Sequence, residues 1–351
     1  MGIGELTVED LRCLRGVQLV LHPRHNLLWG ANGSGKTSLL EALFLLGRGR
    51  SFRTRNSERL IRHGGSQLTV FGRTDRTPSF AVGVQVSRVG GTVARINGAP
   101  AATLTELSQA FPVQVIDPAV HKLLEEGGHR RRRWLDWAVF HVEPQFGAAW
   151  TRYTRTLKQR NAALRQPDGD GAPWDTELTR WGESIAAWRE QVMRLVQPAC
   201  AQLVQRLSGL PVELHYRRGW PADLSLLEAL QTSRDRDRLR GATQMGPHRA
   251  DVLVRLDGRP AREVLSRGQQ KLIAIALTLT PVELLADRAV TPTLLLDDPA
   301  AELDTIHLER FIAEVNRLPC QLLSTSLHAR GGLFSAPDRV FHVEQGAVRP
   351  V

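Results

Sequence analysis

The stretch Gly30-Ala31-Asn32-Gly33-Ser34-Gly35-Lys36-Thr37 decides the fold, because it fits the pattern G-x-x-x-x-G-K-S/T at every fixed position. Its glycines let the backbone curl so that N–H groups point at phosphate oxygens, while Lys36 adds a cation and Thr37 a hydroxyl suited to Mg²⁺. An apolar run at 26–29 precedes it, and residues 38–46 are typical of a helix that begins beside the same anion. A glycine-rich turn without a ligand is the alternative, but the order of strand, loop and helix favours a phosphate-binding loop.

A second apolar strand ends in two carboxylates. Residues 293–296, Thr-Leu-Leu-Leu, are followed by Asp297 and Asp298. Carboxylates at the mouth of a parallel sheet are what a nucleotide-bound Mg²⁺ and its attacking water require. We therefore expect Asp297 to hold the metal through water, and Asp298 to orient or deprotonate the nucleophile.

The heptad Leu265-Ser266-Arg267-Gly268-Gln269-Gln270-Lys271 precedes the apolar run 272–279. Ser266 and the N–H groups after it can cap a helix directed at a phosphate. Taken alone, such a heptad is only a capped helix. Because it precedes the Asp-Asp strand in a chain that has a phosphate loop, we interpret it as the signature motif of an ABC-type ATPase.

The chain is basic, and its charge is unevenly distributed. Its 351 residues include 46 Lys and Arg against 36 Asp and Glu, a formal net charge of +10. Residues 1–116 hold 14 basic and 7 acidic side chains, residues 117–246 hold 20 and 16, and residues 247–351 hold 12 and 13. A basic surface attracts phosphate backbones of any sequence, which favours nucleic acid as the large partner. Anionic lipid is the rival, but no apolar run reaches the roughly 18 residues of a spanning helix.

Cysteine usage and the N-terminus indicate the compartment. Cys13, Cys200 and Cys320 are too few and too far apart for a disulfide framework or a zinc site, so we expect reduced thiols. The start, Met1-Gly2-Ile3-Gly4-Glu5, lacks the basic region of a secretory signal. Together these features predict a cytoplasmic protein with no membrane association.

Hydrophobic periodicity separates helix-like from strand-like segments. From residue 117 to residue 195 apolar side chains recur at helical spacing, with a break at Pro144 and a loop-like stretch rich in Pro, Asp and Gly at 166–174. Elsewhere apolar and polar residues alternate, or form short apolar runs, as they do in strands. The strand-like segments are 4–21, 67–87, 90–97, 212–216, 251–256, 293–296 and, as the last, 321–324.

These segments predict an α/β protein, an ABC-type P-loop ATPase head with a mixed sheet and an inserted helical lobe. We expect residues 1–116 and 247–351 to form the ATPase lobe, because the phosphate loop, the heptad and the Asp-Asp strand lie there. Residues 117–246 are expected to form the helical lobe. The chain is long enough for two domains with a sizeable core.

Together with several shorter motifs, these features closely resemble the RecF family of bacterial DNA replication and repair proteins, whose heads are similar to those of SMC and Rad50 proteins. The resemblance extends from about residue 4 to residue 349. The shorter motifs are Ser51-Phe52-Arg53-Thr54, Gly128-His129-Arg130-Arg131-Arg132-Arg133-Trp134-Leu135-Asp136, Leu157-Lys158-Gln159-Arg160-Asn161, Gly246-Pro247-His248-Arg249 and Glu302-Leu303-Asp304.

The resemblance implies an ATP- and Mg²⁺-dependent protein that binds single-stranded or gapped DNA, forms a homodimer on ATP and hydrolyses ATP slowly, as a weak DNA-dependent ATPase. It also implies work with RecO and RecR, indirect action on RecA and support of the SOS response. In such dimers nucleotide lies between two heads, so Ser266, Gly268 and Gln269 act on the partner's nucleotide. Gln114 matches the glutamine that senses metal and γ-phosphate, and Asp304 closes a loop at the dimer interface.

The chain departs from its relatives at a few positions. Asp298 stands where SMC and ABC proteins have glutamate. An aspartate at this position is usual for RecF-like proteins and fits slow hydrolysis. Ala301 stands where family members often have serine, and Ala119 stands where they often have an acidic residue. The switch histidine of transporters is not obvious, and Thr325 is the candidate in its place.

Arginine clusters and tryptophans each allow two interpretations. Arg48, Arg50, Arg53 and Arg55 reach the nucleotide or DNA phosphates, or are solvated surface residues. The run Arg130 to Arg133 at a helix start opposes the helix dipole, so it binds an external anion or acidic partners, or forms structural salt bridges. The tryptophans at 134, 137, 181 and 188 follow an amphipathic period and are expected to pack helices rather than stack on bases.

Two other function classes compete. An ABC-type subunit acting on a protein or membrane partner would normally carry a signature closer to LSGGQ and a switch histidine. An SMC-like chromosome organiser needs long arms, and the helices between the phosphate loop and the heptad can project only a few nanometres at roughly 1.5 Å per residue.

Overall fold

The computed structural model describes residues 2–74, 78–101, 103–167, 169–286, 288, 290–301, 303–329 and 337–351. The chain divides into two compact units, unit 1 with residues 1–120 and 282–351 and unit 2 with residues 121–281. Compared with the lobes expected from sequence, residues 247–281 group with the helical part. The functional domain boundaries stay a prediction.

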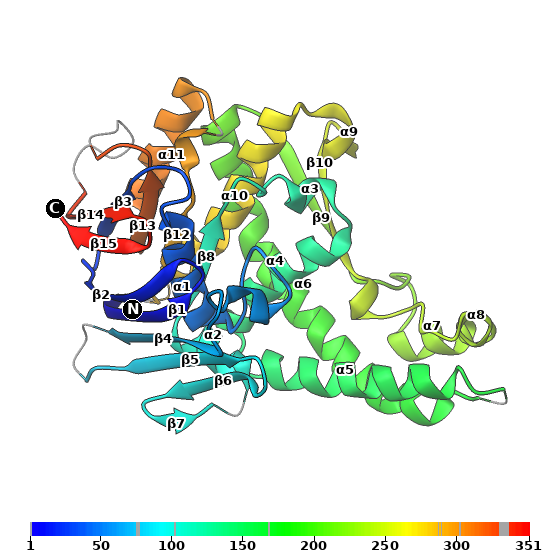
Figure 1. Cartoon of the computed structure of the whole chain (residues 1–351). Helices are drawn as coiled ribbons and strands as arrows, with labels where there is room; N and C mark the ends of the chain where they lie inside the picture. The colour runs from blue at the N-terminus through cyan, green and yellow to red at the C-terminus, as the bar shows by residue number, and fades with distance from the viewer. Residues whose placement is uncertain are drawn as a thin grey trace. The chain divides into compact units, whose positions relative to one another are not determined.

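The first sheet of unit 1 is antiparallel, with strand order β2-β1-β4-β5-β6-β7 (Figure 1). Its strands bury one face, on which Leu6, Val8, Val70 and Val84 are each at most 1 % exposed. This alternation confirms the strand-like segments predicted between residues 4 and 97. The strands are β1 (Ile3–Leu11), β2 (Leu14–Val20), β4 (Gln67–Thr74), β5 (Ala81–Ser87), β6 (Gly91–Ile96) and β7 (Ala99–Pro100).

The second sheet of unit 1 is mixed, with order β15-β14-β3-β13-β12-β8. The strands from β14 to β8 are parallel, and β15 pairs antiparallel at the edge. The predicted mixed sheet is confirmed, but the prediction that 321–324 is the last strand is wrong, because two short strands follow it. The strands are β3 (His25–Trp29), β8 (Val113–Ile116), β12 (Thr293–Leu296), β13 (Gln321–Ser326), β14 (Arg339–Glu344) and β15 (Ala347–Pro350).

Helix α1 (Lys36–Arg48) connects the two sheets of unit 1 through one apolar core. Leu39 and Leu43 of α1 belong to a buried cluster that also contains Val70 of β4, Leu295 of β12 and Leu323 of β13. Burial of each such side chain stabilises the fold by roughly 1.5–3 kcal/mol, so the start of α1 is firmly anchored. The shorter elements of unit 1 are η1 (Ser57–Leu60), α2 (Leu104–Ala110), η3 (Pro299–Ala301) and α11 (Thr305–Arg317).

Unit 2 is mostly helical and contains a small antiparallel sheet of order β11-β10-β9. The helical pattern and its break at Pro144 are confirmed, but the loop predicted at 166–174 is partly wrong, because α6 begins at Ala172 with Pro173 in its first turn. The elements are α3 (Lys122–Glu125), α4 (Gly128–Val142), α5 (Phe146–Ala163), α6 (Ala172–Ser208), β9 (Val212–Arg217), α7 (Leu226–Thr232), α8 (Arg234–Arg240), η2 (Pro247–Arg249), β10 (Asp251–Leu256), β11 (Arg259–Pro260), α9 (Ala261–Val264) and most of α10 (Arg267–Ala286).

Buried arginines hold the helices of unit 2 together. Arg160 of α5 is fully buried and donates to Asp175 and Asp237, both at 2.8 Å. Arg189 of α6 is also fully buried and donates to Asp136 at 2.8 Å and to the carbonyl oxygen of Pro247 at 2.7 Å. Removing one partner would leave a buried charge uncompensated, so these pairs are structural. These contacts give the motifs at residues 157–161 and 246–249 a structural role.

No helix in the described ranges combines the length and the apolar character needed to cross a membrane.

Candidate functional site

The stretch 30–37 connects the end of β3 to the start of α1. Gly30 has to be glycine, because a Cβ there would lie 2.1 Å from the carbonyl oxygen of Val343. The N–H of Gly346, in the turn between β14 and β15, donates to the carbonyl oxygen of Ser34 at 2.8 Å. The curled loop is therefore held by β3, α1 and the C-terminal hairpin together.

Lys36 lies inside this loop rather than in solvent. It is 8 % exposed, and its ammonium donates to the carbonyl oxygens of Gly30 at 2.6 Å and Ala31 at 2.9 Å. Burial lowers the pKa of Lys36, and the charges of Asp298 and Asp297 oppose that shift. A partly desolvated ammonium interacts strongly with an anion, so this geometry suits a phosphate group.

Thr37 and Asp297, far apart in sequence, meet at the carboxyl end of the parallel strands. The Thr37 hydroxyl donates to Oδ1 of Asp297 at 2.9 Å. Thr325 of β13 donates to the same oxygen at 3.2 Å and accepts a hydrogen bond from the N–H of Asp298 at 2.8 Å. Thr325 therefore orients both aspartates, from the position predicted for a switch residue.

The two aspartates differ in environment. Burial raises the pKa of Asp297, and hydrogen bonds from Thr37 and Thr325 oppose the shift. Asp298 has φ 47°, in the left-handed region where Asp and Asn are the best tolerated non-glycine residues. The chain thus turns sharply directly after β12, and the partly buried carboxylate of Asp297 carries a charge that a metal ion would offset.

The residues present fit a Mg²⁺-nucleotide. Ser34 Oγ is buried and has no hydrogen-bond partner among the described residues, and a Cβ at Gly33 would meet nothing within 4 Å. A phosphate oxygen would satisfy the Ser34 hydroxyl. Mg²⁺ prefers oxygen ligands and usually needs few from the protein, as Thr37 and Asp297 would supply. Within the described ranges, no group of three or more His, Cys, Asp or Glu side chains could hold a metal by itself.

A polar cluster on α1 escapes the sequence analysis. The Glu41 carboxylate is fully buried and accepts hydrogen bonds from Arg12 and Ser51, while Arg53 lies 3.7 Å from it. The Ser51 hydroxyl also accepts from the N–H groups of Arg53 and Thr54, at 2.9 and 3.1 Å. The segment 51–54 is thereby folded onto α1. The available signal was that Glu41 is the only acidic residue between positions 11 and 57 of a basic region.

Gln114 and Asp304, assigned from the family resemblance, both lie in unit 1. Gln114 is 9 % exposed on β8, in register with Leu294 of β12. Asp304 caps α11 by accepting a hydrogen bond from the N–H of His307 at 3.0 Å, and it lies 2.6 Å from Nδ1 of the same histidine. These bonds lower the pKa of Asp304. Glu302, in the same motif, lies outside the described residues.

In unit 2 the heptad 265–271 forms the capped helix start that its sequence predicts. Ser266 Oγ accepts from the N–H of Gln269 at 3.3 Å, and Gln269 Oε1 accepts from the N–H of Ser266 at 3.0 Å. This reciprocal capping box begins α10. Gly268 is exposed, and a Cβ there would meet nothing within 4 Å. The turn therefore presents an open backbone surface.

The arginine run 130–133 makes mostly internal contacts. Arg130 pairs with Glu126, four residues earlier. Arg132 donates to the carbonyl oxygen of Ala250 at 2.6 Å. These contacts favour the structural interpretation for Arg130 and Arg132.

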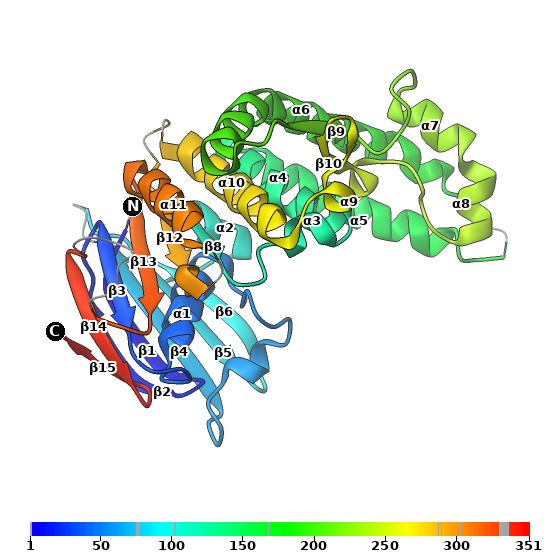
Figure 2. The same ribbon diagram turned by 90° about the horizontal axis from the view of Figure 1, so that it is seen from above.

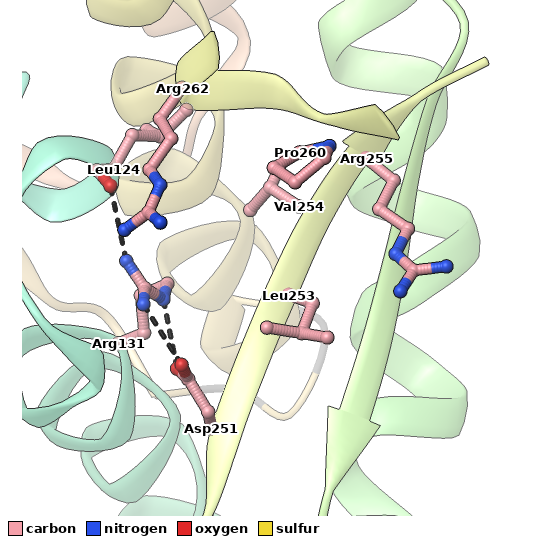
Figure 3. Close-up of a pocket in the computed structure, with 8 residues that line it drawn as sticks. All are labelled: Leu124, Arg131, Asp251, Leu253, Val254, Arg255, Pro260 and Arg262. Carbon is pink, nitrogen blue, oxygen red and sulfur yellow. Dashed lines mark hydrogen bonds and ion pairs between the residues drawn. The ribbon is translucent and has the colours of Figure 1, made fainter. Parts of the chain in front are cut away.

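Arg131 lines a pocket of about 200 Å³ in unit 2, but its donors are already engaged (Figure 3). The guanidinium donates to both carboxylate oxygens of Asp251 at 2.9 Å and to carbonyl oxygens at the end of α3, including that of Leu124 at 3.1 Å. Gly128 lets the Asp251 carboxylate lie close to the start of α4, because a Cβ at residue 128 would lie 2.7 Å from the carboxyl carbon of Asp251. Only Arg133 of the run is left exposed.

The tryptophans differ from one another. Trp134 and Trp137 are 7 % and 2 % exposed, as expected for helix packing, and the ring of Trp188 contacts that of Phe146. Trp181 is not buried. DNA contact by Arg48, Arg50, Arg53 and Arg55 stays a prediction, and Arg53 lies 3.7 Å from the Glu41 carboxylate.

Comparison with known proteins gives a consistent result. Residues 2–348 match the profile described as RecF/RecN/SMC N terminal domain. "DNA replication and repair protein RecF" from Cellvibrio japonicus is 39% identical over 363 residues, and its namesake from Chromohalobacter salexigens is 40% identical over 356, with 99% of each chain covered in both cases. A solved structure titled "Structure of the recombination mediator protein RecF-ATP in RecFOR pathway" is 25% identical, with TM-score 0.90 over 99% of this chain and 97% of that one. An Smc head domain from Pyrococcus furiosus, 14% identical with TM-score 0.61 over 99% of this chain and 95% of its own, shares the fold.

Proposed function

Because the chain belongs to the RecF/RecN/SMC family, and within it to the RecF proteins of DNA replication and repair, we propose that it is a DNA-binding switch driven by ATP. The observation that carries this proposal is the 2.9 Å hydrogen bond between Thr37 of the phosphate loop and Asp297 after β12, with Lys36 fixed in the same loop. ATP binds to residues 30–37, and Thr37 and Asp297 hold Mg²⁺.

The roles of the side chains follow from their positions. Lys36 exchanges its two carbonyl partners for β- and γ-phosphate oxygens, and Ser34 gains the partner that it lacks. When bound at Thr37 and Asp297, Mg²⁺ would neutralise developing phosphate charge. Asp298 orients or deprotonates the attacking water, and Gln114 senses the metal and the γ-phosphate. An aspartate reaches one methylene less far than the glutamate of SMC proteins, which supports slow hydrolysis.

Dimerisation on ATP completes the site. Ser266, Gly268 and Gln269 of one subunit contact the nucleotide of the other, and Asp304 lies at the interface. The open surface at Gly268 and the exposed Asp304 support this arrangement. ATP then joins the two subunits, and its slow hydrolysis separates them.

The partners follow from the family and the charge. The chain binds single-stranded and gapped DNA, works with RecO and RecR, and acts indirectly on RecA and the SOS response. A solved relative is titled as a recombination mediator of the RecFOR pathway, and the net charge of +10 favours phosphate backbones.

The test is binding to gapped, duplex and single-stranded DNA at fixed salt, with and without ATP-Mg²⁺, while the mass in solution is followed. We expect ATP to double the mass and to tighten DNA binding. If ATP binds but neither quantity responds, the switch is refuted, and an ABC-type subunit acting on a protein or membrane partner takes its place.

A further inference from the structure

Helix α5 carries a basic face that no acidic residue of its own offsets. Its 18 residues include no Asp or Glu, while Arg152, Arg155 and Lys158 are exposed. In the described part of the chain none of these three cations pairs with a carboxylate. At 1.5 Å per residue they extend over about 9 Å of the helix, a length over which one strand of B-DNA presents two to three phosphates.

Trp181 of α6 extends this face. Helix α6 packs against α5, and the two helices are neighbours in Figures 1 and 2. The guanidinium carbons of Arg152 and Arg180 lie 4.8 and 4.9 Å from the centroid of the indole ring, whose N–H donates to Glu177. One aromatic ring offsets only part of the repulsion between two cations, so the arrangement favours an added anion.

The other arginines of unit 2 set a contrast. Arg160 and Arg189 are buried against aspartates, and Arg131 is saturated by Asp251 and carbonyl oxygens. The exposed arginines of α8 alternate with Asp235 and Asp237. Helix α5 differs from α8 because its own sequence carries three exposed cations and no carboxylate.

We propose that Arg152, Arg155, Lys158 and Arg180 bind the sugar-phosphate backbone of DNA, and that Trp181 holds two of the guanidiniums in place. This inference rests on the proposed function and names a DNA surface for it. Nucleic acid is the occupant because three exposed cations of α5 follow one another over about 9 Å, which is the length of two to three phosphates of one strand. A membrane-binding helix would expose apolar side chains next to its cations, whereas the apolar face of α5 is buried within unit 2.

The experiment compares the full chain with two triple variants, R152Q/R155Q/K158Q and the control R236Q/R238Q/R240Q, which removes three equally exposed charges from α8. DNA affinity is measured at several salt concentrations with single-stranded and duplex fragments in ATP-Mg²⁺. Each lost phosphate contact lowers the salt slope by about 0.9 on duplex and about 0.7 on single strands, so we expect the α5 variant to lose roughly 2–3 units of slope. We expect the control to lose less than about one unit, and W181L to weaken binding about two- to fivefold.

The outcomes separate this inference from the proposed function. If the wild-type chain binds no DNA, both fall. If the wild type binds and the α5 variant keeps its affinity and slope, only the α5 surface is refuted. The same holds if the control loses as much as the α5 variant, or if the α5 variant loses binding to anionic vesicles and not to DNA. The substituted cations are exposed and Trp181 is only partly buried, so an unchanged thermal midpoint and ATP affinity confirm that each variant is folded.

Discussion

The phosphate loop of unit 1 (residues 30–37) and the signature turn of unit 2 (the heptad 265–271) both place glycine at the start of a helix. Their polar groups differ in how many hydrogen bonds they make with distant parts of the chain. In the phosphate loop, Lys36 is 8 % exposed and donates to two carbonyl groups, and Thr37 is bonded to Asp297 from the other end of the chain. In the signature turn, Ser266 bonds to Gln269 three residues away, and Gly268 meets no neighbour.

The difference shows how each turn obtains its geometry. The phosphate loop depends on long-range contacts, because β3, β12, β13 and the C-terminal hairpin all reach it. The signature turn needs only its own helix and a local capping box. A substitution in the loop should therefore alter what unit 1 binds by itself, whereas a substitution in the turn should alter only what α10 meets from outside.

The largest effect is expected for Asp298→Asn. Loss of a general base slows a reaction by roughly 10²–10⁴-fold, so ATP turnover should fall at least a hundredfold while ATP still binds. Asparagine tolerates the left-handed backbone at φ 47°, so the turn after β12 should persist. Phosphate release at saturating ATP-Mg²⁺ is the measurement. The matched control is Asp257→Asn, at φ 50° in the β10–β11 turn, and unchanged turnover in D298N would remove Asp298 from the chemistry.

Lys36→Arg should lower ATP affinity about tenfold, or roughly 1.4 kcal/mol. The ammonium fits between two carbonyl oxygens at 2.6 and 2.9 Å, and a planar guanidinium keeps the charge but not this shape. ATP binding and ATP-dependent mass are measured together, with the exposed Lys158→Arg as control. Equal ATP affinity in K36R and wild type would show that the loop requires only a positive charge at this position and not the shape of lysine.

Gly268→Glu tests the other half of the comparison. Nothing lies within 4 Å of its virtual Cβ, so the monomer should keep its ATP affinity and its stability within about 0.5 kcal/mol. The ATP-dependent dimer should weaken at least tenfold, because a carboxylate would face the partner's nucleotide. Sedimentation with and without ATP measures this, and Gly16→Glu, at an equally open glycine of unit 1, is the control. A destabilised G268E monomer would mean that the turn has structural partners after all.

The sequence predicts local features of the site well, since the phosphate loop, the Asp-Asp strand and the capped helix each lie within one short segment. The α/β ABC-type head is confirmed by the mixed sheet and by the likeness to an Smc head. The contacts of Glu41 and Asp251 are not predicted, because their arginine partners lie 29 and 120 residues away. Local periodicity carries no information about such pairing. For the same reason Arg131, on a run that suggests an anion site, proves to be an internal partner.

The smallest effect concerns the charge of Asp297. Because burial raises its pKa in the folded chain, the ionised form disfavours folding, and the fold gains stability as the pH falls through that raised value. At neutral pH the ionised carboxylate of Asp297 therefore slightly lowers the free energy of unfolding of the nucleotide-free protein. Asp297→Asn should raise the thermal midpoint at pH 7–8 by about 1–3 °C, and ATP-Mg²⁺ should no longer add stability through the metal.

Asp304→Asn is the matched control, because hydrogen bonds from His307 lower the pKa of that exposed carboxylate. Its ionised form favours folding, so its contribution is present at neutral pH and is lost as the pH falls through the lowered value. Thermal midpoints measured between pH 8 and pH 4 should show the two variants diverging from wild type with opposite dependence on pH. If D297N is instead less stable than wild type at pH 8, the hydrogen bonds that Asp297 accepts from Thr37 and Thr325 in the wild type outweigh the cost of its partly buried charge, and the fold holds this carboxylate without strain.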